Sequence, residues 1–371
     1  MSNTINIDMK RVVLCVPDPW NYYDQFEHCC IMTVNPDNTP ARQKYLLDNS
    51  DWSIKVTQNG VEYRDGGDYP NEKIFAYTSG TTGDSKFYSF SQEKLDHCVD
   101  TIIQSYNITA NDRYVSIMPL WHAHGQTFYW LAKRIKCESH FMSVAGLRNM
   151  PKYSPTFITA VPDMLKVVSQ LDFDQNLRFV RSASVALSNQ LFQTLKDKFN
   201  LPIIEAFGMT ESLSHCFTNP LHGEQRIGTV GLPSGIEATI KFGQLHIRGF
   251  SVFTSDWYNT GDLAELDEHG YYRILGRVKD RINIKGYKID PISIERQLHE
   301  KLSNIGDCII FGNEVVNCIY TGTTDINEIN DCLIKIHPVC RPSFILQTDT
   351  IPLNGNGKLS RLWLINNFKC R

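Results

Sequence analysis

The chain has 371 residues, of which 42% are hydrophobic and 21% are charged, and its formal net charge at pH 7 is −3. These values are ordinary for a globular protein and give no sign of nucleic-acid or membrane binding. No apolar run is long enough to span a membrane and residues 1–6 show no signal-peptide pattern, so we expect a cytoplasmic protein. The eleven cysteines form no Cys-x-x-Cys pair, which favours reduced thiols over disulfides or a zinc site.

Strand-like apolar runs alternate with amphipathic segments of helix length, which is typical of an α/β fold. In chain order, the strands expected before Gly235 are residues 12–17, 54–57, 74–77 and 203–204. The helices expected in the same part of the chain are residues 40–49 and 190–198.

After Gly235 the pattern changes to strands in which apolar and polar residues alternate, as expected when one face of the strand is exposed to solvent. These expected strands are residues 239–241, 244–248 and 271–275, and a helix pattern returns at 292–302. We therefore predict a large N-terminal domain, residues 1–279, of layered α/β sheets plus a β-subdomain. A small α+β domain, residues 280–371, is predicted to follow.

Residues 78–86, Thr-Ser-Gly-Thr-Thr-Gly-Asp-Ser-Lys, form a Gly/Ser/Thr-rich loop directly after a predicted strand. Its two glycines allow the backbone to turn tightly and approach an anion. Its amides and hydroxyls can converge on phosphate oxygens, and Lys86 can add a positive charge. The loop differs from the common G-x-x-x-x-G-K-[ST] pattern because two residues separate Gly83 from Lys86. Taken alone, the segment leaves a flexible surface loop as the alternative.

Further segments follow in a recognisable order: Glu-Ala-Phe-Gly-Met-Thr-Glu at 205–211, Tyr-Asn-Thr-Gly-Asp at 258–262, Gly-Arg-Val-Lys-Asp at 276–280, and the Gly-rich string at 352–361. With the phosphate loop, this set resembles the motifs of the adenylate-forming superfamily. That superfamily contains acyl-CoA synthetases, peptide-synthetase adenylation domains and luciferases. The resemblance runs from about residue 10 to the C-terminus.

The resemblance implies ATP-dependent activation of a carboxylic acid as acyl-AMP, followed by thioester formation on a pantetheine thiol. A carboxylate does not react with a thiol because its leaving oxide is poor, whereas AMP is a good leaving group. The site must hold ATP, neutralise pyrophosphate and align a carboxylate oxygen in line with the α-phosphorus.

The resemblance also implies a nucleotide site. Its expected ATP- and AMP-binding residues are Thr78, Ser79, Gly80, Thr81, Thr82, Gly83, Lys86, Ser184, Val185, Glu205, Ala206, Phe207, Asp262 and Arg277. Asp262 would accept hydrogen bonds from both ribose hydroxyls, and Arg277 would be a second ribose contact. The alternative is that the two residues form only an ion pair at the surface. Ser85 stands where the family usually has proline, and Phe207 where it commonly has tyrosine.

Three residues are expected to be catalytic. Thr210 would contact the α-phosphate, and Glu211 would bind Mg²⁺, since a carboxylate suits a hard, partly hydrated ion. Lys358 corresponds to the lysine that contacts the acyl carboxylate and AMP, where its charge would stabilise the transition state.

A change of conformation is implied for the second half-reaction. Asp280 corresponds to a hinge about which the small domain, mobile in the family, would rotate and withdraw Lys358. Lys285 and Gly286 would then line the thiol channel, where Asn283 stands in place of a lysine common in the family.

Residues 118–125, Met-Pro-Leu-Trp-His-Ala-His-Gly, resemble the acid-pocket motif of small-acid and fatty-acid CoA ligases. The implied pocket residues are His122, His124, Ser182 and Gly208. The His-x-His spacing on an irregular segment also leaves a metal pair or core histidines open. No nearby aspartate is available for an amino-acid ammonium, and residues 181–187 are larger than the family's Gly-Gly-Ala-Pro, so we expect a small carboxylic acid. The nearest resemblance is to the oxalate–CoA and fatty-acyl ligase branch.

Two acceptors fit, free coenzyme A and the phosphopantetheine arm of an acyl or peptidyl carrier protein. The chain is short for the superfamily, and the first strand–helix elements are expected to be missing, which mildly favours a carrier protein. The alternatives are an acyl-AMP-forming or luciferase-like enzyme without thiol transfer, and a non-catalytic nucleotide-binding relative. A Rossmann dehydrogenase is disfavoured because no G-x-G-x-x-G follows a predicted strand.

Overall fold

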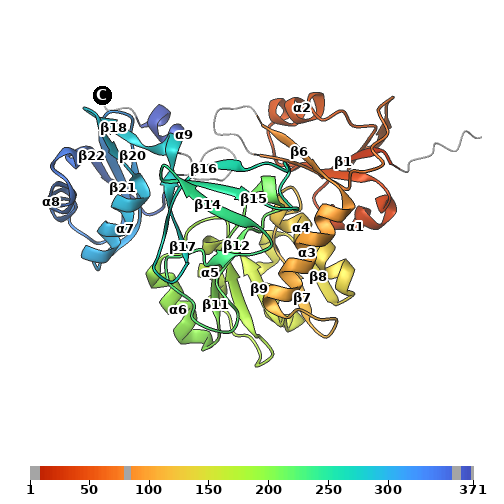
Figure 1. Ribbon diagram of the computed structural model, residues 1–371, viewed down its shortest axis with the longest axis horizontal. Coiled ribbons are helices and arrows are strands. Elements are labelled where there is room, and N and C mark those ends of the chain that lie inside the picture. Colours follow the sequence, from red (N-terminus) through yellow and green to blue (C-terminus); the bar gives the residue numbers. More distant parts are fainter. Residues whose placement is uncertain (1–8, 79–84, 353–360, 369–371) are drawn as a thin grey trace, which may run out of the picture. The chain divides into compact units, whose positions relative to one another are not determined.

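The computed structural model describes residues 9–78, 85–352 and 361–368 (Figure 1). The described residues form two compact units. The first unit comprises residues up to 238 together with 247–258 and 266–273, and the second comprises 239–246, 259–265 and the residues from 274 onward. Because the two units interleave along the chain, the single boundary expected at Asp280 stays a prediction.

A seven-stranded sheet forms the centre of the first unit, in the order β13-β12-β11-β10-β9-β7-β8. Its strands are β7 (Arg113–Ser116), β8 (Glu138–Phe141), β9 (Phe157–Ala160), β10 (Phe179–Ser182), β11 (Ile203–Phe207), β12 (Phe217–Thr218) and β13 (Leu232–Pro233). Strands β7 to β11 pair in parallel, whereas β12 and β13 are antiparallel.

Helices cover both faces of this sheet, which explains why its strands read as continuous apolar runs. One face packs against α3 (Gln92–Tyr106) and α4 (Ala123–Ile135), and the other against α5 (Pro162–Val168) and α6 (Asn189–Phe199) (Figure 1). Ser91 caps the start of α3, and Ser188 that of α6, by accepting a backbone N–H bond. The carboxyl ends of the parallel strands therefore lie at one edge, where ligands bind in such folds.

The first unit also contains a six-stranded sheet in the order β4-β3-β1-β2-β5-β6. Its elements are β1 (Arg11–Cys15), α1 (Trp20–Tyr23), β2 (Cys30–Thr33), α2 (Pro40–Asp48), β3 (Ile54–Thr57), β4 (Gly60–Tyr63), β5 (Ile74–Tyr77) and β6 (Phe87–Phe90). Strands β5 and β6 pair as an antiparallel hairpin whose loop is the predicted phosphate loop.

A four-stranded sheet, β14-β15-β16-β17, contributes segments to both units. Its strands are β14 (Glu237–Lys241), β15 (Gln244–Arg248), β16 (Tyr258–Leu266) and β17 (Tyr272–Arg277). Single-turn or irregular 3₁₀ segments lie at η1 (Asp24–Phe26), η2 (Val144–Tyr153), η3 (Thr210–Ser212), η4 (Val278–Asp280) and η5 (Pro338–Cys340).

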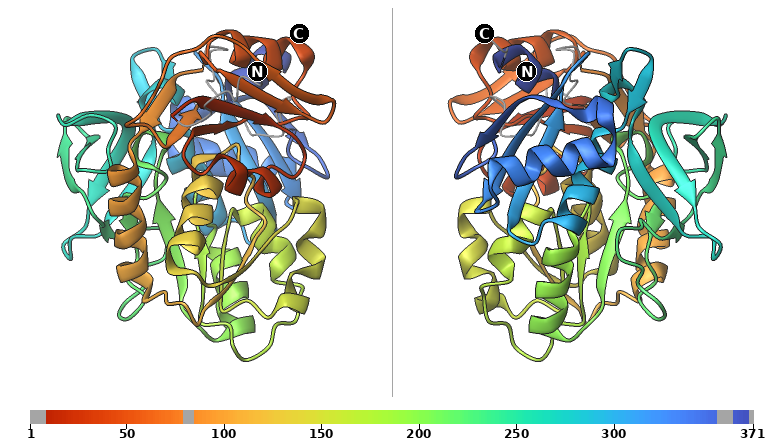
Figure 2. Two further views of the ribbon diagram at one scale, coloured as in Figure 1. Left: turned by 90° about the vertical axis from the view of Figure 1, so that its right-hand side faces the viewer. Right: turned by 90° about the vertical axis from the view of Figure 1, so that its left-hand side faces the viewer.

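The second unit has a core of its own between a three-stranded sheet, β20-β21-β22, and two helices. Its elements are β18 (Ile282–Ile284), β19 (Tyr287–Ile289), α7 (Pro291–Lys301), β20 (Ile305–Phe311), β21 (Val316–Gly322), α8 (Ile326–Ile336), β22 (Pro342–Gln347) and α9 (Arg361–Asn367). Figure 2 shows α7 and α8 side by side across one face of this sheet.

The α/β fold class is confirmed. Every helix and strand expected from the sequence has a counterpart, shifted by at most a few residues at its ends. The ten cysteines in the described ranges are free thiols. Over those same ranges, no helix combines the length and apolar character needed to cross a membrane.

Candidate active site

Two hydrogen bonds between Thr78 and Lys86 close the base of the predicted phosphate loop. Thr78 N–H donates to Lys86 O at 2.9 Å, and Lys86 N–H donates to Thr78 Oγ1 at 3.2 Å. The Lys86 side chain is exposed to solvent. Ser79, Gly80, Thr81, Thr82 and Gly83 lie outside the described residues, so their predicted role is carried by the sequence alone.

Ser85 is buried beside this base. Its hydroxyl donates to the Thr78 carbonyl and accepts a hydrogen bond from the Arg42 guanidinium. The family that the motifs resemble usually has proline at this position. The hydroxyl gives the loop base two attachments that a proline side chain could not make.

Glu211 is a buried carboxylate on η3, directly after Thr210. Tyr88 Oη donates to Glu211 Oε1 at 3.0 Å and Tyr258 Oη donates to the same oxygen at 3.4 Å. The second oxygen, Oε2, accepts no hydrogen bond from a described residue. Burial and this carboxylate raise the pKa of the Tyr88 hydroxyl, so it remains a donor. Two tyrosines thus orient Glu211 and leave one oxygen available to a ligand.

That arrangement fits Mg²⁺ held largely by substrate and water. Magnesium commonly uses one or two carboxylates together with phosphate oxygens and retains several waters. No group of three or more His, Cys, Asp or Glu side chains in the described part of the chain could hold a metal alone. Glu211 would therefore be the protein's contribution, with the Thr210 hydroxyl next to it.

Glu205, on β11, is buried and its carboxylate has an unusual environment. Leu187 N–H donates to Glu205 Oε1 at 3.0 Å, whereas Oε2 has no hydrogen bond to a described residue. Burial raises the pKa of Glu205 to about 7. The side chain therefore changes charge near neutral pH. Its neighbour Ala206 is also buried, so it can offer a ligand only backbone groups.

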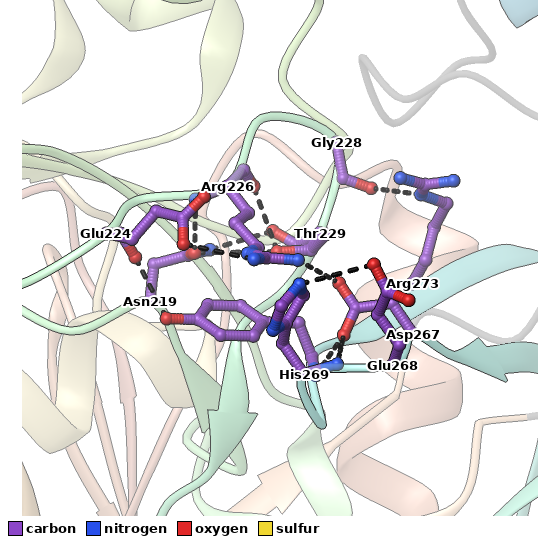
Figure 3. Close-up of polar contacts among 10 residues, drawn as sticks. Asn219, Glu224, Arg226, Gly228, Thr229, Asp267, Glu268, His269 and Arg273 are labelled. Atoms are coloured by element: carbon purple, nitrogen blue, oxygen red, sulfur yellow. Dashed lines mark hydrogen bonds and ion pairs between the residues drawn. The ribbon is translucent and has the colours of Figure 1, made fainter.

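The loop after β12 is fastened beside Glu205 by a polar cluster that contains Asn219, Arg226 and Asp267 (Figure 3). Asn219 Nδ2 donates to Glu205 O at 3.0 Å and to Thr229 O at 2.8 Å. Arg226 forms an ion pair with Asp267 at 2.9 Å, so the loop is tied to the β16–β17 turn. This cluster holds the backbone around Glu205 and was not expected from the sequence.

Phe207 ends β11 with its ring half-buried, at a centroid distance of 6.0 Å from Phe217. The chain then turns at Gly208, where an added Cβ would lie 2.1 Å from the Ser214 backbone. Glycine is therefore needed at 208 for backbone packing, whatever its role in the acid pocket. Cys216 N–H donates to Phe207 O at 2.9 Å and closes this turn.

The two residues expected at the ribose are brought together. Asp262 is buried in β16, and Arg277 Nε at the end of β17 lies 2.9 Å from Asp262 Oδ1. The pair differs from the simple surface ion pair that was its alternative, because the carboxylate is only 3% exposed. Its proposed ribose contacts remain a prediction.

The two histidines of the predicted acid pocket lie at the start of α4. His122 precedes the helix and is half-buried, while His124 is its second residue and is buried. The expectation of an irregular segment was wrong here, because Ala123 already begins the helix. His124 Nε2 lies 2.8 Å from Thr159 Oγ1 and 3.3 Å from Nη1 of Arg181.

Arg181 is the residue at this site that the sequence analysis did not single out. A charged residue directly after the apolar pair Phe179-Val180 is the signal that could have found it. The other predicted residues on this segment differ in exposure. Ser182 is buried, whereas Ser184, with a positive φ of 77°, and Val185 are exposed after β10 ends.

The predicted thiol-channel residues form a tight turn between β18 and β19. Lys285 and Gly286 both have positive φ, 50° and 92°, as a two-residue hairpin of type I′ requires. Gly286 N–H donates to Asn283 Oδ1 at 3.2 Å, so this asparagine shapes the turn. Asp280 lies 3.8 Å from the Arg361 guanidinium. Lys358 lies outside the described residues.

Known proteins resemble this chain along most of its length. Residues 71–245 match the family described as AMP-binding enzyme. The oxalate–CoA ligase of Arabidopsis thaliana is 29% identical over 80% of this chain and 67% of its own length. The sulfoacetate–CoA ligase of Cupriavidus necator is 27% identical over 79% of this chain and 66% of its own. The chain thus spans about two thirds of the length of these relatives.

A solved structure has the same fold. O-succinylbenzoate coenzyme A synthetase from Bacillus subtilis, in complex with AMP, superposes with a TM-score of 0.82 at 19% identity, covering 98% of this chain and 89% of its own. The match to AMP-binding enzymes covers a little less than half of the chain, and the similarity of fold extends over nearly all of it. The resemblance to adenylate-forming enzymes that the motifs predicted is confirmed, whereas the roles of the individual site residues stay predictions.

Proposed function

We propose that this protein activates a small carboxylic acid with ATP and transfers the acyl group to the thiol of coenzyme A. The observation that carries the proposal is Glu211, a buried carboxylate oriented by two tyrosines through one oxygen, inside a motif of the adenylate-forming superfamily.

In the first half-reaction, a carboxylate oxygen of the acid attacks the α-phosphorus and pyrophosphate leaves with the bridging oxygen. Thr210 would donate to the α-phosphate, Glu211 would hold Mg²⁺, and Lys86 would add a positive charge near the departing pyrophosphate. When bound, Mg²⁺ neutralises phosphate charge. Lys358 would stabilise the developing charge at the reacting carboxylate.

In the second half-reaction, the thiol attacks the acyl carbon, its proton passes to solvent, and AMP leaves. The curated relatives are named CoA ligases, which favours free coenzyme A over the carrier-protein arm that the sequence mildly suggested. The phosphopantetheine thiol of a carrier protein is the second acceptor of the acyl group to test. The acids named for the relatives, oxalate and sulfoacetate, are small, in agreement with the small acid expected here.

The test is pyrophosphate release from ATP and Mg²⁺ with a panel of acids, with and without coenzyme A. We expect acid-dependent release that coenzyme A stimulates. Glu211→Gln should lower kcat/KM at least 100-fold, because the neutral amide is a poor Mg²⁺ ligand. Glu268→Gln is the matched control, since Glu268 is an exposed carboxylate whose side chain is 86% accessible. Equal activity of the two variants, or no release with any acid although ATP binds, would contradict the proposal.

A further inference from the structure

Arg181 is completely buried in β10, between the sheet and helices α3 and α4. Its Nε donates to Tyr106 Oη at 2.9 Å and its Nη1 donates to Thr159 Oγ1 at 3.1 Å. No carboxylate in the described parts of the chain forms an ion pair with it. Arginine stays charged at any physiological pH, and a buried charge without a counter-ion is costly. The Phe128 ring, 5.3 Å away, offsets only part of that cost.

Two buried polar atoms without a partner, one on Arg181 and one on His124, are donors. Because Nη1 can only donate, its 3.3 Å bond to His124 requires a lone pair on Nε2, which assigns the proton of the neutral ring to Nδ1. His124 Nδ1 and Arg181 Nη2 are both buried and have no hydrogen-bond partner among the described residues. Two unused donors beside one positive charge complement a group that only accepts hydrogen bonds and carries negative charge.

The neighbouring histidines do not add charge. Burial, reinforced by the positive charge of Arg181, holds the pKa of His124 well below its usual value. Burial likewise lowers the pKa of His215 to about 3. The cluster therefore presents one fixed positive charge, enough for a single carboxylate or sulfonate.

The position of Arg181 next to His124 suggests that its charge acts on the carboxylic acid substrate. His124 is one of the predicted acid-pocket residues, and it is the second residue of α4, a helix of 13 residues whose N-terminal end also favours an anion. His122, two residues earlier, is only half-buried. The residues predicted for the acid pocket thus include a half-buried histidine, His122, and a buried one, His124, that contacts the Arg181 cation.

We propose that Arg181 binds a second anionic group of the acid, so that the preferred substrate is a small diacid whose other carboxylate reacts with ATP. This rests on the proposed function. Oxalate, sulfoacetate and O-succinylbenzoate, which appear in the names of the relatives, each carry two acid groups. Arg181 is then a specificity-determining residue that selects against monocarboxylates.

Matched acids test this selection, because malonate differs from propionate, and succinate from butyrate, by a carboxylate in place of a methyl group. The wild-type protein should prefer the diacid at least tenfold in kcat/KM. Arg181→Met should raise KM for the diacid at least tenfold and leave KM for ATP and for the monocarboxylate unchanged. Arg134→Met, at an exposed position of α4, is the control. No diacid preference in the wild type, or an equal loss for both acids in Arg181→Met, would overturn the inference.

Calorimetry of malonate and propionate binding to the unmodified chain tests the anion site without requiring the proposed reaction. Malonate binding that Arg181→Met abolishes, without any pyrophosphate release, would support the anion site and contradict the function. Release with monocarboxylates alone would support the function and contradict the anion site. If Arg181→Met does not fold, Arg181→Lys is the variant to measure, because lysine keeps the positive charge but lacks the several N–H donors of the guanidinium group. A diacid KM raised at least threefold, with an unchanged monocarboxylate KM, is expected.

Discussion

At Glu211, two tyrosine hydroxyls converge on one oxygen of a buried carboxylate, and their distances differ: 3.0 Å for Tyr88 and 3.4 Å for Tyr258. A hydrogen bond to a charged group is stronger than one between neutral groups, and it weakens as the distance grows. The two donors should therefore contribute unequally to the stability of the carboxylate and to its orientation.

The first prediction concerns these tyrosines. Tyr88→Phe should lower the free energy of unfolding by about 1–2 kcal/mol, because it removes the shorter bond to a buried charge. Tyr258→Phe, which removes the same chemical group from the longer bond, should cost less. Urea unfolding of both variants measures the difference, and a larger loss in Tyr258→Phe would contradict the assignment.

The second prediction concerns Glu205, whose pKa is raised from 4.5 to about 7 by burial. A carboxyl group with a raised pKa in the folded state stabilises the fold at low pH, and this contribution is lost as the pH rises from about 4.5 through 7. At pH 8 the ionised form costs on the order of 3 kcal/mol.

Glu205→Gln should accordingly become more stable than the wild type as the pH rises. The difference in Tm between variant and wild type should increase from pH 5 to pH 8, since the amide stays neutral and can still accept from Leu187 N–H. Glu268→Gln, an exposed carboxylate, should show no such trend. A difference in Tm that is independent of pH would contradict the buried, titrating Glu205.

At the scale of elements, the turn that follows β11 depends on close backbone approach. An added Cβ at Gly208 would lie 2.1 Å from the Ser214 backbone, whereas one at Gly228 meets nothing within 4 Å although its φ is +73°. The cost at Gly208 is therefore steric, while the cost at Gly228 is conformational.

These two glycines give the third prediction. Gly228→Ala should cost about 1–2 kcal/mol, the usual penalty of a left-handed conformation for alanine. Gly208→Ala should cost more than this, because backbone cannot move aside as a flexible side chain can, and it should also abolish acid-dependent activity. Thermal unfolding of the two variants checks the order. A milder effect at Gly208 would show that the turn can relax.

Elements with a clear pattern could be predicted from the sequence, and the reason is local. The alternation in residues 244–248 predicts β15, and the Gln190–Lys198 pattern predicts α6 to within one residue at each end. The start of α4 could not be predicted in this way. No Ser, Thr, Asp or Asn occupies the position before Ala123, and His122 forms no side-chain cap bond, so the usual signal for a helix start is missing.

At the scale of the whole molecule, the two compact units have separate apolar cores. Leu195, on α6, is fully buried in the first unit, and Leu298, on α7, is fully buried in the second. Separate cores can unfold as separate cooperative units.

The fourth prediction follows from this division. Leu298→Ala should destabilise the second unit by about 2–5 kcal/mol, as removal of a buried leucine side chain usually does, and Leu195→Ala should do the same to the first. Scanning calorimetry should resolve two transitions, each lowered by one of the substitutions. A single transition that both substitutions lower equally would contradict independent cores.

Much of the candidate site could be predicted because its residues lie in contiguous motifs. The strings around Glu211 and Asp262 name the residues directly, whereas the partners that orient them come from distant strands. Tyr88 lies 123 residues before Glu211, and Arg181 lies 57 residues after His124. Such long-range pairing depends on the sheet order and therefore required the structure.

The central claim, acid adenylation followed by transfer to a thiol, is tested most directly by mass spectrometry of the reaction products. The protein is incubated with ATP, Mg²⁺ and malonate without a thiol, and coenzyme A is added afterwards. We predict an acyl-AMP and pyrophosphate in the first step, and conversion of the adenylate to the acyl-CoA thioester and AMP in the second. Formation of ADP and phosphate, or no adenylate with malonate or any other acid of the panel despite bound ATP, would contradict the account.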